Sequence, residues 1–231
     1  MIRYFEGTVF NLETQALVNT VNCVGFMGAG IALEFMLRYP SMFEDYAEKC
    51  KNGKITIGKV DYFNGADGRV IINFPTKQDF KYPSRINWIE QGLINFVQTY
   101  KEQGIKSVAF PKLGTNNGGL NWDDVKQVME KYLSKIDIDV CICLDKTKEA
   151  EGLELVMLNK FNSMSLNQIE SIVKLNTKQK INIQKEMPYK RFWKINETPS
   201  VGKKTYAALF KYFYDYSING IENPIQMSLF E

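Results

Sequence analysis

Short apolar runs alternate with helical patterns through the first 144 residues, and this alternation constrains the fold more than any other feature of the chain. The apolar runs predict strands at residues 2–5, 16–21, 60–63, 70–74, 107–110 and 138–144. Most of these runs are apolar on both faces, as in strands that helices cover on both sides of a sheet. The helical patterns predict helices at residues 31–38, 40–50, 84–103 and 123–134, with Ser84 as the cap of the third. Residues 1–146 are therefore expected to form an α/β domain with three layers, α/β/α.

The composition changes after this region. Residues 145–151 are polar and charged, which is typical of a domain edge. Helical patterns follow at residues 149–161, 166–175 and 203–218, whereas residues 185–199 are irregular. Residues 147–231 are therefore expected to be a mainly helical C-terminal region, either a small domain or an appendage packed on the first.

The chain contains no histidine, and this absence excludes whole classes of mechanism. Ser-His-Asp and Cys-His catalysis and histidine–zinc sites all require the imidazole ring. Its four cysteines, at positions 23, 50, 141 and 143, lack the Cys-x-x-Cys spacing of a zinc or redox site. No metal or cofactor is therefore expected, and lysine, a carboxylate, cysteine, tyrosine or a substrate-bound water must carry the chemistry. The start of the chain is not a signal peptide and no apolar run reaches the roughly 20 residues of a membrane helix, so a cytoplasmic protein without a membrane partner is expected.

Two glycine-bearing loops follow predicted strands and lead into predicted helices. The first holds Gly28, Ala29 and Gly30 after a strand that carries Asn22. Glycine lets the backbone approach a ligand, and amides at a helix start favour a phosphate, although a purely structural turn has the same pattern. The Asn22 amide has the donor and acceptor needed for paired ribose hydroxyls, or it forms an Asx-turn at the strand end.

The second loop reads Gly114-Thr115-Asn116-Asn117-Gly118-Gly119. Its glycines and asparagines tolerate positive φ several times, and such backbones form nests that bind anions. An ordinary strand-to-helix loop is the alternative, but it does not need so many permissive positions. Two loops of this kind, each leading into a helix, favour a ligand with two phosphates.

Lys77 follows the fourth predicted strand and Pro75. Ligands of open α/β sheets gather outside the carboxyl ends of the strands, where this lysine lies beside both loops. A partly buried lysine loses its charge more easily and can then act as a nucleophile or base. The alternative is the role of most lysines, a solvated surface charge.

These segments resemble those of macrodomains, which are ADP-ribose-binding α/β/α modules, and within that family the DarG group. The similarity lies in the run from Asn19 to Ala32, in Asn73-Phe-Pro-Thr-Lys77 with Pro83-Ser-Arg85, and in Leu113-Gly114 with Gly118-Gly119-Leu120 and Trp122. It covers about residues 1–145 and implies a three-layer macrodomain with a mixed central sheet. It further implies a DNA ADP-ribosyl glycohydrolase that removes ADP-ribose from bases of single-stranded DNA and so reverses a DarT-like toxin.

The resemblance implies a role for each site residue. Lys77 acts at the anomeric carbon through a transient lysine adduct with the opened ribose. Asn22 orients the distal ribose, and the two glycine loops hold the diphosphate. The residues expected to contact ADP-ribose are Thr8, Val9, Asn22, Gly28, Ala29, Gly30, Ile31, Thr76, Leu113, Gly114, Thr115, Asn116, Asn117, Gly118, Gly119 and Leu120.

Three positions depart from the family pattern. The second loop lacks the glycine that usually stands between the first glycine and the last pair, but Asn116 or Asn117 tolerates positive φ, so binding is expected to survive. Lys112 stands where relatives often carry an uncharged residue. Many macrodomains place an aspartate after the first-strand glycine to bind the adenine amine, whereas here Thr8 follows Gly7, so backbone groups of Thr8 and Val9 would have to read adenine.

The C-terminal region allows several interpretations. In DarG-like proteins it binds and blocks the toxin, but here it carries a surplus of basic residues. Tyr189, Phe192 and Trp193, with the neighbouring basic residues Lys185, Lys190, Arg191 and Lys194, would suit stacking and pairing with single-stranded DNA. The alternative is a small aromatic core with a solvated basic rim. The tail from Gln226 to Phe230 resembles the short peptide by which bacterial proteins dock on the replication sliding clamp.

Four functions are thus left open by the residues. The first is removal of ADP-ribose from DNA, which needs Lys77 and both loops. The others are recognition of ADP-ribose without turnover, neutralisation of a toxin by protein contact through residues 151–231, and hydrolysis of a small ADP-ribose derivative such as a phosphate or acyl ester.

Overall fold

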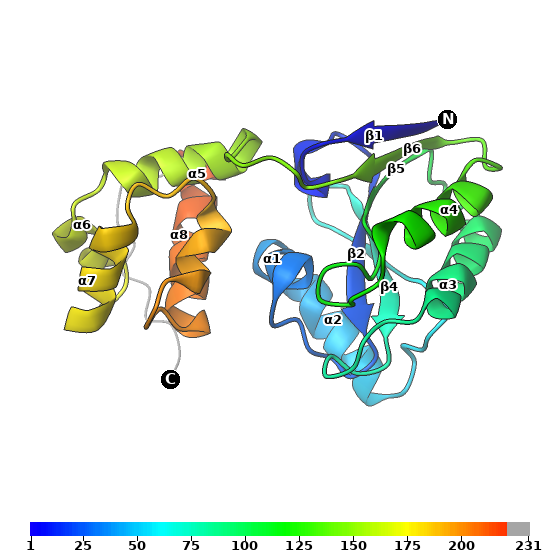
Figure 1. Ribbon diagram of the computed structural model, residues 1–231, viewed down its shortest axis with the longest axis horizontal. Coiled ribbons are helices and arrows are strands. Elements are labelled where there is room, and N and C mark those ends of the chain that lie inside the picture. Colours follow the sequence, from blue (N-terminus) through cyan, green and yellow to red (C-terminus); the bar gives the residue numbers. More distant parts are fainter. Residues whose placement is uncertain (221–231) are drawn as a thin grey trace. The chain divides into compact units, whose positions relative to one another are not determined.

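The computed structural model describes residues 1–220, which form two compact units. The first unit spans Met1–Lys146, and the second begins at Thr147. Figure 1 shows the strands of the first unit and the helices of both. None of the helices in this described part is long and apolar enough to cross a membrane.

The first unit is built on a mixed sheet. Its strands are β1 (Ile2–Phe5), β2 (Ala16–Asn22), β3 (Asp61–Asn64), β4 (Val70–Lys77), β5 (Ser107–Pro111) and β6 (Asp139–Cys143). They lie in the order β1-β6-β5-β2-β4-β3. Only the edge pair β3–β4 is antiparallel among the strand pairs of residues 1–146, while the other pairs are parallel. The carboxyl ends of β2, β4 and β5 therefore meet at one edge of the sheet.

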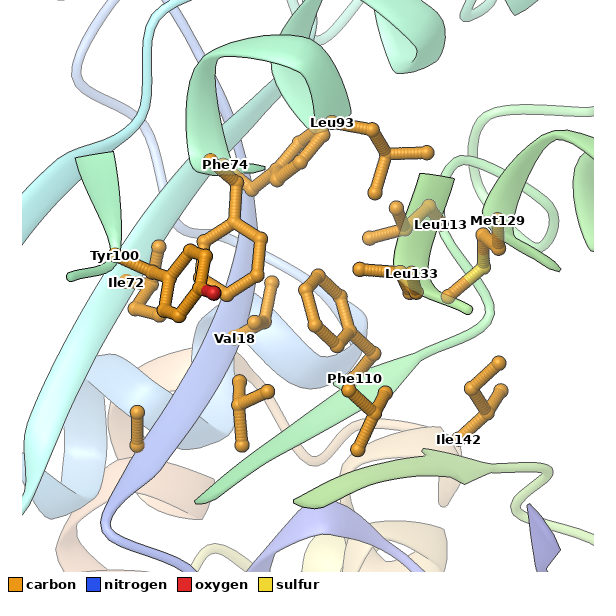
Figure 2. Close-up of a cluster of buried hydrophobic side chains, with 14 of the residues drawn as sticks. Val18, Ile72, Phe74, Leu93, Tyr100, Phe110, Leu113, Met129, Leu133 and Ile142 are labelled. Atoms are coloured by element: carbon orange, nitrogen blue, oxygen red, sulfur yellow. The ribbon is translucent and has the colours of Figure 1, made fainter. Parts of the chain in front are cut away.

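Helices cover both faces of this sheet (Figure 1). On one face lie α1 (Gly30–Arg38), α2 (Pro40–Lys51) and the short 3₁₀ helix η1 (Val9–Asn11). On the other lie α3 (Ile86–Thr99) and α4 (Trp122–Leu133), whose apolar side chains enclose the cluster in Figure 2. Successive strand residues alternate between the two faces, as Leu17 and Val18 do. The predicted three-layer fold with a mixed sheet is confirmed.

The contact between α3 and β4 depends on a glycine. A Cβ atom at Gly92 would lie 2.3 Å from the Phe74 ring, so no side chain fits at this position. Phe74 is fully buried (Figure 2), and burying a phenylalanine side chain stabilises a fold by roughly 1.5–3 kcal/mol. Gly92 thus exchanges some helix propensity for close packing of the helix on the sheet.

The start of α3 differs from the prediction. Arg85 is the N-cap residue, and its side chain makes no capping hydrogen bond. Ser84 is buried instead, and its backbone amide donates to the Gly118 carbonyl at 2.9 Å. The expectation that Ser84 caps this helix is therefore wrong, because tertiary contact with a loop more than 30 residues away takes the serine out of the capping position.

The second unit is mainly helical, as predicted. Its helices are α5 (Gly152–Ser163), α6 (Leu166–Ile172), α7 (Thr177–Glu186), the 3₁₀ helix η2 (Phe192–Glu197) and α8 (Lys203–Asn219). The helix α7 was not predicted, because its sequence is polar and buries only Gln179 and Ile183. A capping box formed by Asn176 and Gln179 starts this helix in place of a strong apolar period.

An aromatic core holds the second unit together. The Phe161 ring contacts the rings of Tyr189, Phe192 and Phe213 at centroid distances of 5.7, 6.0 and 5.3 Å. The buried Arg191 guanidinium pairs with the Glu154 carboxylate at 3.0 Å. These contacts tie α5, η2 and α8 into one unit. The clamp-like run from Gln226 to Phe230 lies outside the described residues.

Candidate functional site

The pairing of β2 with β4 places Asn22 beside Lys77. The two residues are partners in the strand register, after an irregularity that follows Val21. Beyond the strand ends, the Cys23 amide donates to the Gln78 carbonyl at 3.2 Å. A backbone hydrogen bond therefore joins the start of the first glycine loop to the segment that follows Lys77.

The second glycine loop closes over the same point. The Lys77 Nζ donates to the Asn117 carbonyl, and the Ser84 amide donates to the Gly118 carbonyl as described above. A Cβ atom at Gly30 would lie 2.9 Å from Asn117 Nδ2, so the first loop touches the second. In Figure 1 the green loop before α4 lies next to α1. The structure thus brings the three predicted segments together around the Lys77 amine.

The second loop is a tight turn that needs its glycines. Gly114 and Gly119 have φ of +65° and +74°, a region that L residues with side chains rarely adopt. A Cβ atom at Gly118 would lie 2.1 Å from the Gly114 carbonyl oxygen. The Leu120 amide closes the turn on Gly114 at 3.1 Å, and within the described hydrogen bonds the amides of residues 115–118 have no acceptor. Free amides in such a turn form an anion site.

The helix starts beside the two loops differ in their capacity for a phosphate. The N-cap residue of α1, Ala29, provides no side-chain cap, and the first bond of that helix runs from Leu33 to Ala29. The amides of its first turn are therefore available to an anion. The start of α4 is already capped, because Asn121 Oδ1 accepts from the amides of Asp123 and Asp124.

The prediction that both helix starts serve phosphates is therefore wrong for α4. The carboxylates of Asp123 and Asp124 lie in its first turn and would repel an anion there. If the second loop binds a phosphate, the amides of its own turn at residues 115–118 must do so, and not those of α4.

Asn22 is engaged in local structure. Its Nδ2 donates to the Phe26 carbonyl, and its Oδ1 accepts from the Val24 amide at 3.0 Å and the Tyr46 hydroxyl at 3.1 Å. The side chain is buried in this arrangement. These are the hydrogen bonds of the Asx-turn alternative, and the role at the distal ribose stays a prediction.

Lys77 is half-buried at the end of β4. Its Nζ also donates to the Phe80 carbonyl at 3.4 Å, so two backbone carbonyls hold the amine. Burial lowers the pKa of Lys77 below the ordinary lysine value, because desolvation disfavours the charged form. A lysine with a lowered pKa supplies more neutral amine near neutral pH, which is the form that attacks an electrophile.

Several predicted contact residues point their side chains into the core. Val9 and Leu113 are fully buried, and the Thr76 hydroxyl donates to the Val21 carbonyl at 3.4 Å. Ile31 and Leu120 pack on the two apolar clusters of the first unit. These residues can meet a ligand mainly through their backbone. Gly28, Ala29, Thr115 and Asn116 lie in the loops themselves, and Thr8 precedes η1.

A buried polar chain beneath the site was not predicted. Asn19 Nδ2 donates to Asn73 Oδ1 at 3.1 Å, and Asn73 Nδ2 donates to Asp61 Oδ2 at 3.3 Å. Lys49 then pairs with Asp61 at 2.7 Å. The chain links β2, β4, β3 and α2. Its signal in the sequence is the asparagine that interrupts each of two apolar strands, and these asparagines are partners in the register.

The C-terminal aromatic residues do not form the expected stacking surface. Tyr189 and Phe192 are 6% and 1% exposed, and Arg191 is held by Glu154. The prediction that Tyr189 and Phe192 stack on DNA bases is therefore wrong, because both rings belong to the small aromatic core that the alternative described. Trp193 is partly exposed, with Lys194 Nζ 4.3 Å from its ring centroid.

The described residues hold neither a candidate metal site nor a reactive thiolate at Cys23. Residues 1–220 contain no group of three or more histidine, cysteine or acidic side chains arranged to hold a metal ion. The cysteines are free thiols, and burial raises the pKa of Cys23 to about 11, so it is not a ready thiolate.

Comparisons with known proteins agree with this geometry. A family model described as Macro domain matches residues 18–129. The solved macrodomain of Mycobacterium tuberculosis DarG is 46% identical, with a TM-score of 0.61, and the match covers 62% of this chain and 97% of that one.

Two curated relatives are longer than this chain. The DNA ADP-ribosyl glycohydrolase of M. tuberculosis is 47% identical over 146 residues, which are 62% of this chain and 42% of that protein. A DNA ADP-ribosyl transferase–DNA ADP-ribosyl glycohydrolase fusion protein of Thermosipho africanus is 35% identical over 168 residues, covering 65% of this chain and 43% of that protein. The chain thus spans less than half of the length of these relatives.

Proposed function

Because this chain belongs to the macrodomain family, we propose that it removes ADP-ribose from bases of single-stranded DNA. The observation that carries the proposal is the meeting of both glycine loops at the Lys77 amine. The M. tuberculosis relative is named for this activity, and the Macro domain match at residues 18–129 falls on the unit that contains this site.

Each loop and strand end contacts a different part of ADP-ribose in this proposal. One phosphate of ADP-ribose lies at the uncapped start of α1, and the second lies on the amides of residues 115–118. The distal ribose lies between Asn22 and Lys77, which are neighbours in the register. Backbone groups of Thr8 and Val9 read adenine, since the Val9 side chain is buried in the core.

The chemistry is a displacement by lysine followed by hydrolysis. The neutral Lys77 amine attacks the anomeric carbon of the ribose, a carbon–nitrogen bond forms, and the bond to the DNA base breaks. The base leaves with the proton that the amine loses. In this adduct the bond from the anomeric carbon to the ring oxygen then breaks, a proton passes from the nitrogen to that oxygen, and an imine of the opened ribose forms. Water hydrolyses the imine, which releases ADP-ribose and restores the amine. The two carbonyls that hold Nζ orient it for the first step.

The proposed setting is a toxin–antitoxin pair in the cytoplasm. The Thermosipho africanus relative is named as a fusion of a DNA ADP-ribosyl transferase with the glycohydrolase, which supports a DarT-like transferase as the source of the substrate. Residues 147–231 would contact that toxin, and residues 226–230 would dock on the sliding clamp.

The test is release of ADP-ribose from an oligonucleotide modified on one thymine or one guanine. Lys77→Ala is expected to lower the rate on the order of 10²–10⁴-fold, while ADP-ribose affinity stays within a few-fold of wild type. Lys77→Arg is the matched control for charge, and it should be equally inactive because a guanidinium has no neutral form near pH 7. Tight ADP-ribose binding by wild type without release from either substrate would identify a reader module instead.

A further inference from the structure

Exposed apolar side chains follow the carboxyl ends of the paired strands β2 and β4. Five large hydrophobic residues of the first unit that are exposed come from the segments after Asn22 and Lys77: Val24, Phe26, Phe80, Tyr82 and Ile86, which are 47%, 43%, 43%, 64% and 38% exposed. Single exposed apolar residues are ordinary, but exposed apolar side chains that touch one another mark a contact surface. The Phe26 and Phe80 rings do touch, and we call these two residues the aromatic rim.

The rim is attached directly to the proposed site. The Phe26 and Phe80 rings lie 4.6 Å apart between centroids and are tilted by 42°. Phe26 comes from the first glycine loop, and its carbonyl accepts from Asn22. The Phe80 carbonyl accepts from Lys77 Nζ at 3.4 Å. Both rings are thus carried by backbone that also positions the proposed catalytic amine and its neighbour.

Positive charge accompanies the rim. Lys81 and Arg85 are exposed, and the Lys81 Nζ lies 5.7 Å from the Phe80 ring centroid. The one carboxylate of this segment, Asp79, accepts a hydrogen bond from the Lys81 amide at 2.9 Å and so serves the local turn. Residues 77–85 therefore carry three cationic side chains and one anionic side chain.

We propose that the aromatic rim binds the single-stranded DNA on either side of the modified base. Bases next to the ADP-ribosylated nucleotide stack on Phe80 and Phe26, and Lys81 and Arg85 lie along the backbone phosphates. Exposed aromatic rings with interleaved cations are the general means of holding single-stranded nucleic acid, because every base has a face to stack. The inference rests on the proposed function and adds to it the surface that distinguishes DNA from a free ADP-ribosylated nucleoside.

A kinetic comparison of two substrates tests the rim. The substrates are an ADP-ribosylated oligonucleotide and the corresponding ADP-ribosylated mononucleoside. Phe80→Ala and Phe26→Ala are each expected to lower kcat/KM on the oligonucleotide about tenfold more than on the mononucleoside, as loss of one stacked base predicts. Phe80→Trp should retain the preference for the oligonucleotide. Trp193→Ala, which removes a partly exposed aromatic ring of the second unit, is the matched control and should change neither rate.

The outcomes separate this inference from the proposed function. Equal losses on both substrates would overturn it, because the rings would then shape the ADP-ribose pocket, and so would the absence of loss on either. Binding of unmodified oligothymidine is measured in parallel by fluorescence anisotropy and needs no catalysis. If wild type releases no ADP-ribose, the proposed function fails, whereas weaker oligothymidine binding by the two alanine variants would still support the rim. Unchanged ADP-ribose affinity of each variant establishes that it is folded.

Discussion

At the scale of single residues, the state of Lys77 is set by what surrounds it. Two carbonyls hold its amine, and burial lowers its pKa. The sequence contains 29 lysine and arginine residues in all, and nothing in its composition separates this one from the rest. Lys77 is distinguished from the other basic residues by its place at the end of a buried strand, between two glycine loops.

The rate of ADP-ribose release should depend on pH through this lysine. Below its folded-state pKa the amine is charged and unreactive, so the rate is expected to rise about tenfold per pH unit and then level off. Because burial lowers this pKa, the plateau should begin below the ordinary lysine pKa. Single-turnover rates of ADP-ribose release, measured across the pH range, give the pH at which the plateau begins. A profile that rises only above the ordinary lysine pKa would contradict the assignment.

Gly118 gives a second prediction at this scale. A Cβ atom here would lie 2.1 Å from the Gly114 carbonyl and 2.4 Å from Ser84 Oγ, so Gly118→Ala must displace the turn. We expect a loss of about 1–3 kcal/mol in stability and about tenfold or more in ADP-ribose affinity. Calorimetry gives both values. Gly202→Ala is the control, because no atom lies within 4 Å of its added Cβ.

At the scale of elements, the two helices that follow the glycine loops serve the site differently. The first turn of α1 has no side-chain cap, whereas Asn121 caps α4 and acidic residues follow it. The same strand–loop–helix pattern in the sequence thus produces one open and one closed helix start. Of these two helix starts, the first therefore has free amides for an anion, and the second loop offers them in its own turn.

Asn121→Ala tests this difference between the helices. Loss of the cap should lower stability by about 1 kcal/mol, as for other caps, and should change ADP-ribose affinity little. Thermal unfolding and ligand titration measure the two effects. Asn121→Asp keeps the acceptor and should keep the stability. A gain in ADP-ribose affinity for the alanine variant would show that the freed α4 amides take a phosphate after all.

At the scale of the whole molecule, each unit has its own core. The first contains the apolar clusters on both faces of the sheet, and the second contains the aromatic cluster around Phe161. The solved macrodomain of M. tuberculosis DarG matches the first unit and is 97% covered by this chain. A unit with a complete core of its own is expected to fold alone.

Residues 1–146 produced by themselves should therefore bind ADP-ribose with the affinity of the full chain, within about twofold. The ligand-binding segments and their supporting hydrogen bonds all lie within this unit. Isothermal titration of both proteins provides the comparison. A fragment that folds, as judged by a cooperative melt, but binds at least tenfold more weakly would mean that the second unit contributes to the site.

The sequence by itself determined the layered fold and the segments of the site. The periods of strands and helices are local patterns in the sequence. Glycine loops at strand ends can also be predicted from the sequence, because glycine adopts their positive φ angles readily. Tertiary structure alone decided which atoms meet: the Asn117 carbonyl on Lys77, the burial of Ser84, and the linked asparagines beneath the site. These partners lie between 34 and 54 residues apart, and their meeting depends on strand order and register, which no local pattern specifies. The Phe26 and Phe80 rings likewise meet because β2 pairs with β4, and no local pattern in the sequence specifies that pairing.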